Sequence, residues 1–179
     1  AVLVLCAVGG VQSQSITVDR QMKRYNVPRL AFINKMDRTG ADFDNAVETM
    51  RARLHANAVP IQMPIGAEKN FLGVIDLIEM KAYTWDEDAK DVTIAEVPDE
   101  LREEAERRRE EMIENVAEFH DDMLEKFVEG EPVSIEEIKA AIRAGTIALK
   151  LTPVLAGSAF KDKGVQNLLD AVVDYLPCP

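Results

Sequence analysis

The sequence has little of the residue chemistry that cross-links a fold or holds a metal ion. Its 179 residues include two cysteines, Cys6 and Cys178, and two histidines, His55 and His120. Two cysteines make no disulfide framework, so we expect a reducing compartment and a buried Cys6 that behaves as a small apolar residue. Neither histidine lies at metal-ligand spacing from a cysteine or carboxylate, which favours surface or packing roles.

Long hydrophobic runs are also missing. No apolar stretch approaches the roughly 20 residues that a membrane-spanning helix needs, and we expect no membrane partner. The apolar opening AVLVLCAV has no basic flank and no small-residue cleavage site, so it is a poor signal peptide. A hydrophobic content of 47% and a charged content of 30% are typical of a globular protein with a proper core. An opening inside a strand, without an initiating Met, leads us to expect a piece of a longer product.

The net charge of −11 is unevenly distributed. Residues 86–137 carry 21 acidic and 6 basic side chains, whereas the rest of the chain carries 11 acidic and 15 basic ones. An acidic segment is therefore inserted into a nearly neutral scaffold. Its field repels phosphate backbones, so we expect no extended nucleic-acid binding by this chain.

The first 58 residues alternate between strand and helix patterns. Residues 1–8 form the continuous apolar run of a strand buried on both faces of a parallel sheet, and residues 29–33 form a second strand. A helix is expected at 13–25, and another begins at Asp42 or Asp44 as its cap. This order is the βαβ rhythm of a parallel α/β domain. The inward residues that we expect on the two helices are Ile16, Met22, Tyr25, Phe43, Val47 and Leu54.

From about residue 59 the pattern changes. Short apolar or alternating runs favour a small antiparallel or mixed sheet, with Trp85 in the core. A long helix is expected at 98–129, with a charged first half in solvent and a packed stripe in its second half. A capping box at Ser134 begins another helix. The expected stripe consists of Met112, Val116, Phe119, Met123 and Phe127.

Residues 152–157 return to the buried-strand pattern, and a helix at 164–176 follows. We interpret the chain as α/β, with three parallel strands and their helices in residues 1–58 and 151–179. An acidic α+β insert subdomain, residues 59–150, interrupts them. The inward residues expected on the last helix are Val165, Leu168, Leu169, Val172 and Leu176.

The second strand runs straight into Asn34, Lys35 and Asp37 with no turn residue between. These polar groups are costly to desolvate unless a ligand satisfies them. Guanine presents two parallel donors, N1–H and the N2 amine, and an ionised Asp37 can accept both. The Asn34 amide can bond N7 and tie neighbouring loops together, while the apolar stem of Lys35 can lie over the base. By itself the four-residue pattern Asn-Lys-x-Asp, at residues 34–37, is also compatible with an ordinary polar turn.

The third strand supplies a second half-site at the same sheet edge. It is followed by Gly157, Ser158 and Ala159, where the Ala159 N–H can donate to guanine O6 and Ser158 can brace the Asp37 loop. Lys161 and Lys163 are expected at the solvent edge of this loop. The sequence therefore predicts a guanine-nucleotide site formed by Asn34, Lys35, Asp37, Ser158, Ala159 and Phe160.

Three stretches carry a family resemblance: NKMDRTGADF, PIQMPIGAEKNFLGVIDLIEMKAYTWDED and GSAFKDKGVQNLLDAVVDYLP. They resemble the elongation factor G family of ribosomal translocation GTPases, almost from end to end. The resemblance implies a partial P-loop-GTPase-like parallel sheet, with GTP or GDP as ligand and NKxD and GSA as the fourth and fifth guanine-nucleotide motifs. The acidic segment resembles the G′ insert of that family, which implies contacts with the stalk protein of the large ribosomal subunit.

The resemblance further implies a monomer in the cytoplasm. The stretch VDRQMKRYNVP is similar to mitochondrial-type members, so the mitochondrial matrix stays open as an alternative. Ribosome-protection and release-factor GTPases share the NKxD motif, but the long match through the insert favours the translocase.

The sequence departs from the family pattern in the motifs that bind the nucleotide phosphates. The sequence has no G-x-x-x-x-G-K-[ST] loop, no switch Thr and no D-x-x-G before its first strand. In the family these parts precede residue 1, and the Mg²⁺ ligands lie among them, so the resemblance implies a GTPase parent and an inactive isolated chain. The alternative hypothesis is an interaction module whose acidic helices dock the stalk protein while its nucleotide site stays idle.

Overall fold

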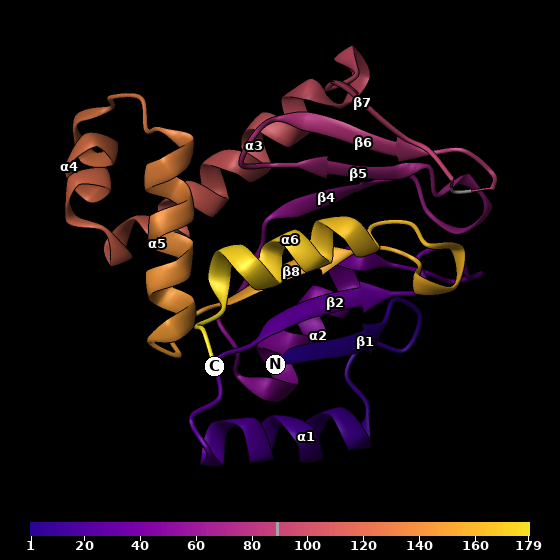
Figure 1. The fold of residues 1–179 in the computed structure, drawn as a ribbon, viewed down its shortest axis with the longest axis horizontal. Coiled ribbons are helices and arrows are strands. Elements are labelled where there is room, and N and C mark those ends of the chain that lie inside the picture. Colours follow the sequence, from indigo (N-terminus) through magenta and orange to yellow (C-terminus); the bar gives the residue numbers. More distant parts are fainter. Residues whose placement is uncertain (89) are drawn as a thin grey trace.

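The computed structural model describes residues 1–88 and 90–179, and within them two four-stranded sheets organise the chain (Figure 1). The first sheet is parallel, in the order β1-β2-β8-β3, and the second is antiparallel, in the order β4-β5-β6-β7. This arrangement confirms the mixed α/β class. The parallel strands are β1 (Val2–Cys6), β2 (Leu30–Asn34), β3 (Ala58–Pro60) and β8 (Thr152–Ala156). The antiparallel strands are β4 (Gln62–Ile65), β5 (Gly73–Asp76), β6 (Lys81–Trp85) and β7 (Val92–Glu96).

Helices cover both faces of the parallel sheet (Figure 1). Side chains of a strand alternate between faces, so each face has its own core. Leu3, Ala31 and Val154 pack with α2 and the inner side of α1, whereas Phe32 and Leu155 pack with α6 and with helices of the insert. The helices are α1 (Ser13–Arg24), α2 (Phe43–Leu54), α3 (Asp99–Val116), α4 (Asp121–Glu129), α5 (Ile135–Ile147) and α6 (Val165–Tyr175). Short 3-10 turns are η1 (Glu68–Asn70), η2 (Ala117–Phe119) and η3 (Ala159–Lys161).

The third expected strand lies where the sequence predicted it. β8 pairs with β2 in parallel, with Ala31 opposite Val154, and β1 pairs with β2 from its other side. The sheet nevertheless contains a fourth strand that we did not expect, because β3 pairs with β8. Only Ile61 separates β3 from β4, so the chain changes sheets within one residue. The division at residues 58/59 and 150/151 stays a prediction, and each of the two cores contains residues of both parts.

The expectation that the first strand is buried on both faces was wrong. β1 is an edge strand, and Val4, which lies opposite Phe32 of β2, is 55% exposed. Cys6 is half-buried rather than buried. On α6, Leu169 is 59% exposed although we expected it to face inward, and Ala171 and Tyr175 are buried instead. The helix therefore turns Leu169 toward solvent. Tyr25, at the end of α1, is exposed as well.

The long helix expected at 98–129 is interrupted. α3 ends at Val116, η2 follows, and His120 adopts an extended conformation with φ −148°. His120 caps α4, because its Nδ1 accepts a hydrogen bond from the Met123 N–H at 3.2 Å. The apolar stripe survives the break: Met112, Val116 and Met123 are all buried. The change of direction lets both segments pack against α5, which begins with the expected capping box at Ser134.

The charged first half of α3 is less solvated than its composition predicts. Arg108 donates to both carboxylate oxygens of Asp44 on α2, at 2.7 and 2.8 Å, and to Glu104 at 2.8 Å. Hydrogen bonds from Arg107 and Arg108 hold the pKa of Glu104 at about 2. A bidentate arginine thus ties the insert to the helix that follows the Asp37 loop. No helix in the described residues is long and apolar enough to cross a membrane.

One buried acid fixes α1 against the chain that enters β2. Asp19 is 2% exposed and forms ion pairs with Arg29 at 2.7 Å and with Lys23 at 2.9 Å. The Arg29 side chain is also largely buried. Because removing one partner of a buried pair leaves an uncompensated charge, this pair should matter more to stability than the surface pairs.

We expect Asp19→Ala to lower the free energy of unfolding by about 3 kcal/mol, because the buried Arg29 loses its counter-charge. Urea titration followed by circular dichroism measures this change. The control is Glu48→Ala, which breaks an exposed pair with Arg51 and should cost less than about 1 kcal/mol. Equal losses of unfolding free energy in the two variants would contradict the larger contribution of the Asp19–Arg29 pair.

Candidate nucleotide-base site

The predicted site residues from two distant segments meet at the carboxyl edge of the parallel sheet. Asn34 is the last residue of β2, and β8 ends at Ala156, immediately before the loop that carries Ser158. Since β2 and β8 are parallel neighbours, the loops that follow them lie side by side. The open edge of an α/β sheet at strand carboxyl ends is a common place for ligands.

The side-chain oxygen of Asn34 joins the two loops. Its Oδ1 accepts a hydrogen bond from the Lys35 N–H at 2.8 Å and another from the Ala159 N–H at 2.9 Å. Asn34 therefore ties neighbouring loops together, as the sequence predicted. Its Nδ2 has no acceptor among the described residues and is free to donate to a ligand.

Asp37 is held by a second bond between the same loops. The hydroxyl of Ser158 donates to Asp37 Oδ1 at 2.7 Å, and Ser158 is buried. A charge-assisted bond of this length fixes the carboxylate orientation. Oδ2 and the second lone pair of Oδ1 stay available for donors outside the protein.

Met36 anchors the loop, a role that the sequence analysis missed. Its side chain is fully buried, its N–H donates to the Gly157 carbonyl at 3.1 Å, and its carbonyl accepts from the Glu68 N–H at 2.8 Å. Lys35 before it is exposed and takes a left-handed conformation with φ +65°. This turn lets Met36 point into the core while the neighbouring polar side chains point out. An apolar residue within a run of polar ones was the available signal.

The role predicted for the Ala159 N–H needs correction. It was expected to donate to a guanine O6, but Asn34 already occupies it. The next amide, that of Phe160, has no acceptor among the described residues. The Phe160 side chain is 93% exposed and packs on no described element. The backbone of Phe160, rather than that of Ala159, is therefore the unpaired donor of η3.

Three further residues, two in the insert and one just after η3, support these loops. Sequence reasoning did not find their roles. Glu68 accepts from the Gly40 N–H at 2.7 Å, and Gln62 accepts from the Ala156 N–H at 3.0 Å. Lys163, which we placed at the solvent edge, is buried instead and donates to the Phe71 carbonyl at 3.4 Å. Lys161 is exposed, as expected.

The available groups form an acceptor pair beside two donors. Asp37 offers two carboxylate oxygens, whereas Asn34 Nδ2 and the Phe160 N–H are unpaired donors. The edge of guanine carries the complement: two donors at N1 and N2, and acceptors at O6 and N7. Within residues 1–88 and 90–179, no three His, Cys, Asp or Glu side chains are arranged to hold a metal ion. These donors and acceptors are complementary to the edge of guanine.

Known proteins resemble this chain over nearly its whole length. A family model described as the elongation factor Tu GTP binding domain matches residues 1–178. Elongation factor G of Thermotoga maritima is 57% identical over an alignment that covers 100% of this chain and 26% of that protein. A crystal structure of a protein from Thermus thermophilus superposes with a TM-score of 0.86 at 31% identity, over 98% of this chain and 26% of that one. The chain thus spans about a quarter of the length of both.

We expect Asn34→Ala to speed hydrogen exchange of the Ala159 amide about fivefold, because a hydrogen bond worth about 1 kcal/mol is lost between the loops. NMR-detected exchange measures the rate. The control Asn34→Asp keeps an oxygen acceptor and should preserve protection. Unchanged exchange in Asn34→Ala would show that the loops are held together by other contacts.

Proposed function

Since this chain belongs to the family of elongation factor Tu GTP binding domains, we propose that its strand-edge site binds the guanine base of GTP and GDP in a translational GTPase of the elongation factor G type. One observation carries the proposal. Ser158 holds the carboxylate of Asp37 in place, at the edge where Asn34 Nδ2 and the Phe160 N–H remain unpaired.

Specificity for guanine follows from the orientation of this carboxylate. Asp37 accepts from the N1–H and the N2 amine, a charge-assisted fork. Adenine offers an acceptor at N1 and no amine at C2, so the same carboxylate would face a lone pair. On the other side of the base, Asn34 and the Phe160 N–H donate to N7 and O6. The Lys35 stem lies over the ring, and its ammonium reaches solvent.

The nucleotide phosphates and Mg²⁺ need other ligands than the base does, and the residues of this chain do not supply them. The sequence contains no G-x-x-x-x-G-K-[ST] loop, and the described residues form no metal-binding cluster at the base site. Ser158 and Asp37 are engaged with each other. We therefore assign base recognition to this chain, and assign phosphate binding, Mg²⁺ and GTP hydrolysis in ribosomal translocation to the longer protein, in the cytoplasm or the mitochondrial matrix.

A second candidate function concerns the insert. α4 exposes Leu124 and Val128 one turn apart, and other residues of the same helix line an open cavity of about 550 Å³ with a strongly acidic lining. Apolar anchors surrounded by carboxylates suit a partner with an apolar and basic face. We propose this surface as the contact of a monomeric translation factor with the stalk protein of the large ribosomal subunit. Its acidic residues include Asp122, Glu125, Glu129, Glu131 and Glu137.

In a full-length protein that contains this chain, we expect Asp37→Asn to exchange the preference for GTP for a preference for XTP. The new amide donor would face the guanine N2 amine, at a cost of about 1–3 kcal/mol or roughly tenfold in affinity, whereas the C2 oxygen of xanthine can accept from it. Competition titrations with the two nucleotides measure the exchange.

The matched control for that variant is Asp42→Asn, which changes the same charge at the cap of α2, where an amide oxygen can still accept from the Asn45 N–H. It should leave the GTP preference intact. If Asp37→Asn weakens GTP and XTP equally, Asp37 is a structural residue and the base assignment fails.

For the 179-residue chain alone, we expect no metal-dependent GTP hydrolysis above background. Most of the binding energy for a nucleotide comes from its phosphates and Mg²⁺, and neither finds ligands in this sequence. Phosphate release from a mass-verified preparation measures the activity. Turnover that depends on Mg²⁺ and persists through purification would refute the assignment of GTP hydrolysis to the longer protein.

A further inference from the structure

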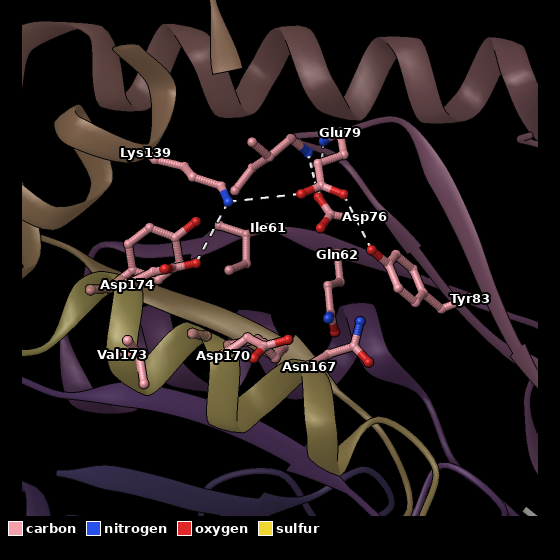
Figure 2. Close-up of a pocket in the computed structure, with 14 residues that line it drawn as sticks. Ile61, Gln62, Asp76, Glu79, Tyr83, Lys139, Asn167, Asp170, Val173 and Asp174 are labelled. Carbon is pink, nitrogen blue, oxygen red and sulfur yellow. Dashed lines mark hydrogen bonds and ion pairs between the residues drawn. The ribbon is translucent and has the colours of Figure 1, made fainter. Parts of the chain in front are cut away.

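A second polar cavity lies away from the base site, where the antiparallel sheet meets α5 and α6. It encloses about 250 Å³ (Figure 2). Its walls come from β4, from the turn between β5 and β6, from the middle of α5 and from one side of α6. The roles described for the base site do not involve its acidic groups.

The lining of this cavity is strongly acidic. It includes the carboxylates of Asp76, Glu79, Asp170 and Asp174, and one cation, Lys139. The Lys139 ammonium is 3.8 Å from Glu79 and 3.6 Å from Asp174, as Figure 2 shows, so both contacts are longer than hydrogen bonds. A further cation, Arg109 on α3, acts on Asp76 electrostatically. Burial raises the pKa of Asp76, whose Oδ1 also accepts from the Ile78 and Glu79 N–H groups. Glu79 accepts from the Tyr83 hydroxyl, so Asp170 is the carboxylate of the cavity that has no protein partner among the described residues.

A hydroxyl without a partner, on a buried side chain, gives independent support for a ligand. Tyr175 lines the cavity and is 2% exposed, and its hydroxyl makes no hydrogen bond within the described residues. Burial first, and then the charges of Asp76, Asp174 and Glu79, raise the pKa of Tyr175, so the hydroxyl stays protonated at neutral pH. The hydroxyl oxygen is open to the cavity, where a ligand can reach it.

The buried amide of Gln62 completes the polar floor. Its oxygen accepts from the Ala156 N–H, and its nitrogen has no acceptor in the described part of the chain. Figure 2 shows the amide end of Gln62 beside Asn167 and near Asp170, across the cavity from Lys139. The cavity therefore offers hydrogen-bonding groups on its floor as well as carboxylates around its rim.

The spacing of the carboxylates argues against a single metal ion. No three acidic, His or Cys side chains in the described residues converge closely enough to coordinate one. Asp170 and Asp174 lie one helical turn apart, about 6 Å along the axis, a distance that a tetramethylene chain between two ammonium groups also spans. Asp76 and Glu79 lie on the opposite wall (Figure 2). The complementary cation is one whose charge is distributed along a chain.

We propose that this cavity binds a linear aliphatic polyamine. Its ammonium groups pair with Asp170 and Asp174 on one wall and with Asp76 and Glu79 on the other, and one ammonium donates to the Tyr175 hydroxyl. The methylene segments contact Ile61, Ala171 and Val173. Lys139 already places an alkylammonium between Glu79 and Asp174, so the cavity is compatible with this chemistry. The proposal does not depend on the function of the base site.

Isothermal titration calorimetry of the 179-residue chain with spermidine tests the proposal. We expect one saturable site that MgCl₂ at matched ionic strength does not displace. The double variant Glu79→Gln/Asp170→Asn should weaken binding about tenfold, because two charge pairs are lost. The matched control is Glu103→Gln/Glu106→Gln, which removes the same charge from an exposed part of α3 and should leave the affinity unchanged.

Tyr175→Phe separates the cavity from general charge attraction, because it leaves every carboxylate in place. We expect about threefold weaker spermidine binding or more and no loss of thermal stability, since the hydroxyl has no protein partner. The proposal fails if the α3 control weakens binding as much as the cavity variant does, or if MgCl₂ displaces spermidine. It also fails if Tyr175→Phe binds spermidine as tightly as the parent chain.

Discussion

The parallel pairing of β2 with β8 is the constraint on which the rest of the structure depends. It places Ala31 opposite Val154, so that Asp37 and Ser158, 121 residues apart in sequence, come within 2.7 Å. Strands in a parallel sheet end at a common edge, and two loops that are individually unremarkable thereby become one site. The insert has to leave the sheet through β3 and return through β8, which are themselves neighbours. A long excursion of the chain is thus closed by one pair of adjacent strands.

The sequence predicted the residues at that edge better than the bonds among them. Asn34, Asp37 and Ser158 were found because polar residues directly after apolar strands have few physical explanations. Which acceptor the Ala159 amide takes depends on the side-chain rotamer of Asn34, and no pattern encodes that. Met36 was missed for the opposite reason: its side chain is apolar and packs in the core, and its hydrogen bonds come from its backbone, which no side-chain pattern encodes.

The errors in the predicted fold have similar physical causes. β3 has three residues and ends at Pro60, too short a run for periodicity to separate it from β4. The break at His120 is invisible in the apolar spacing, because the stripe continues through it. Leu169 was misplaced because helical periodicity identifies apolar positions but not the width of the sheet beneath them. Capping residues, by contrast, act locally: Ser134 was predicted correctly, and Asp42 was one of the two caps expected for α2.

The open edge of β1 has a colloidal consequence. Within the described residues its outer N–H and C=O groups meet no strand, and Val4 is exposed beside them. An unprotected edge with apolar flanks is a template for strand addition between molecules. In this chain the opposing influence is the net charge of −11, which keeps copies apart at low ionic strength. Salt screens that repulsion beyond about 10 Å at 0.1 M, so the solubility of the isolated chain is tied to ionic strength rather than to its fold alone.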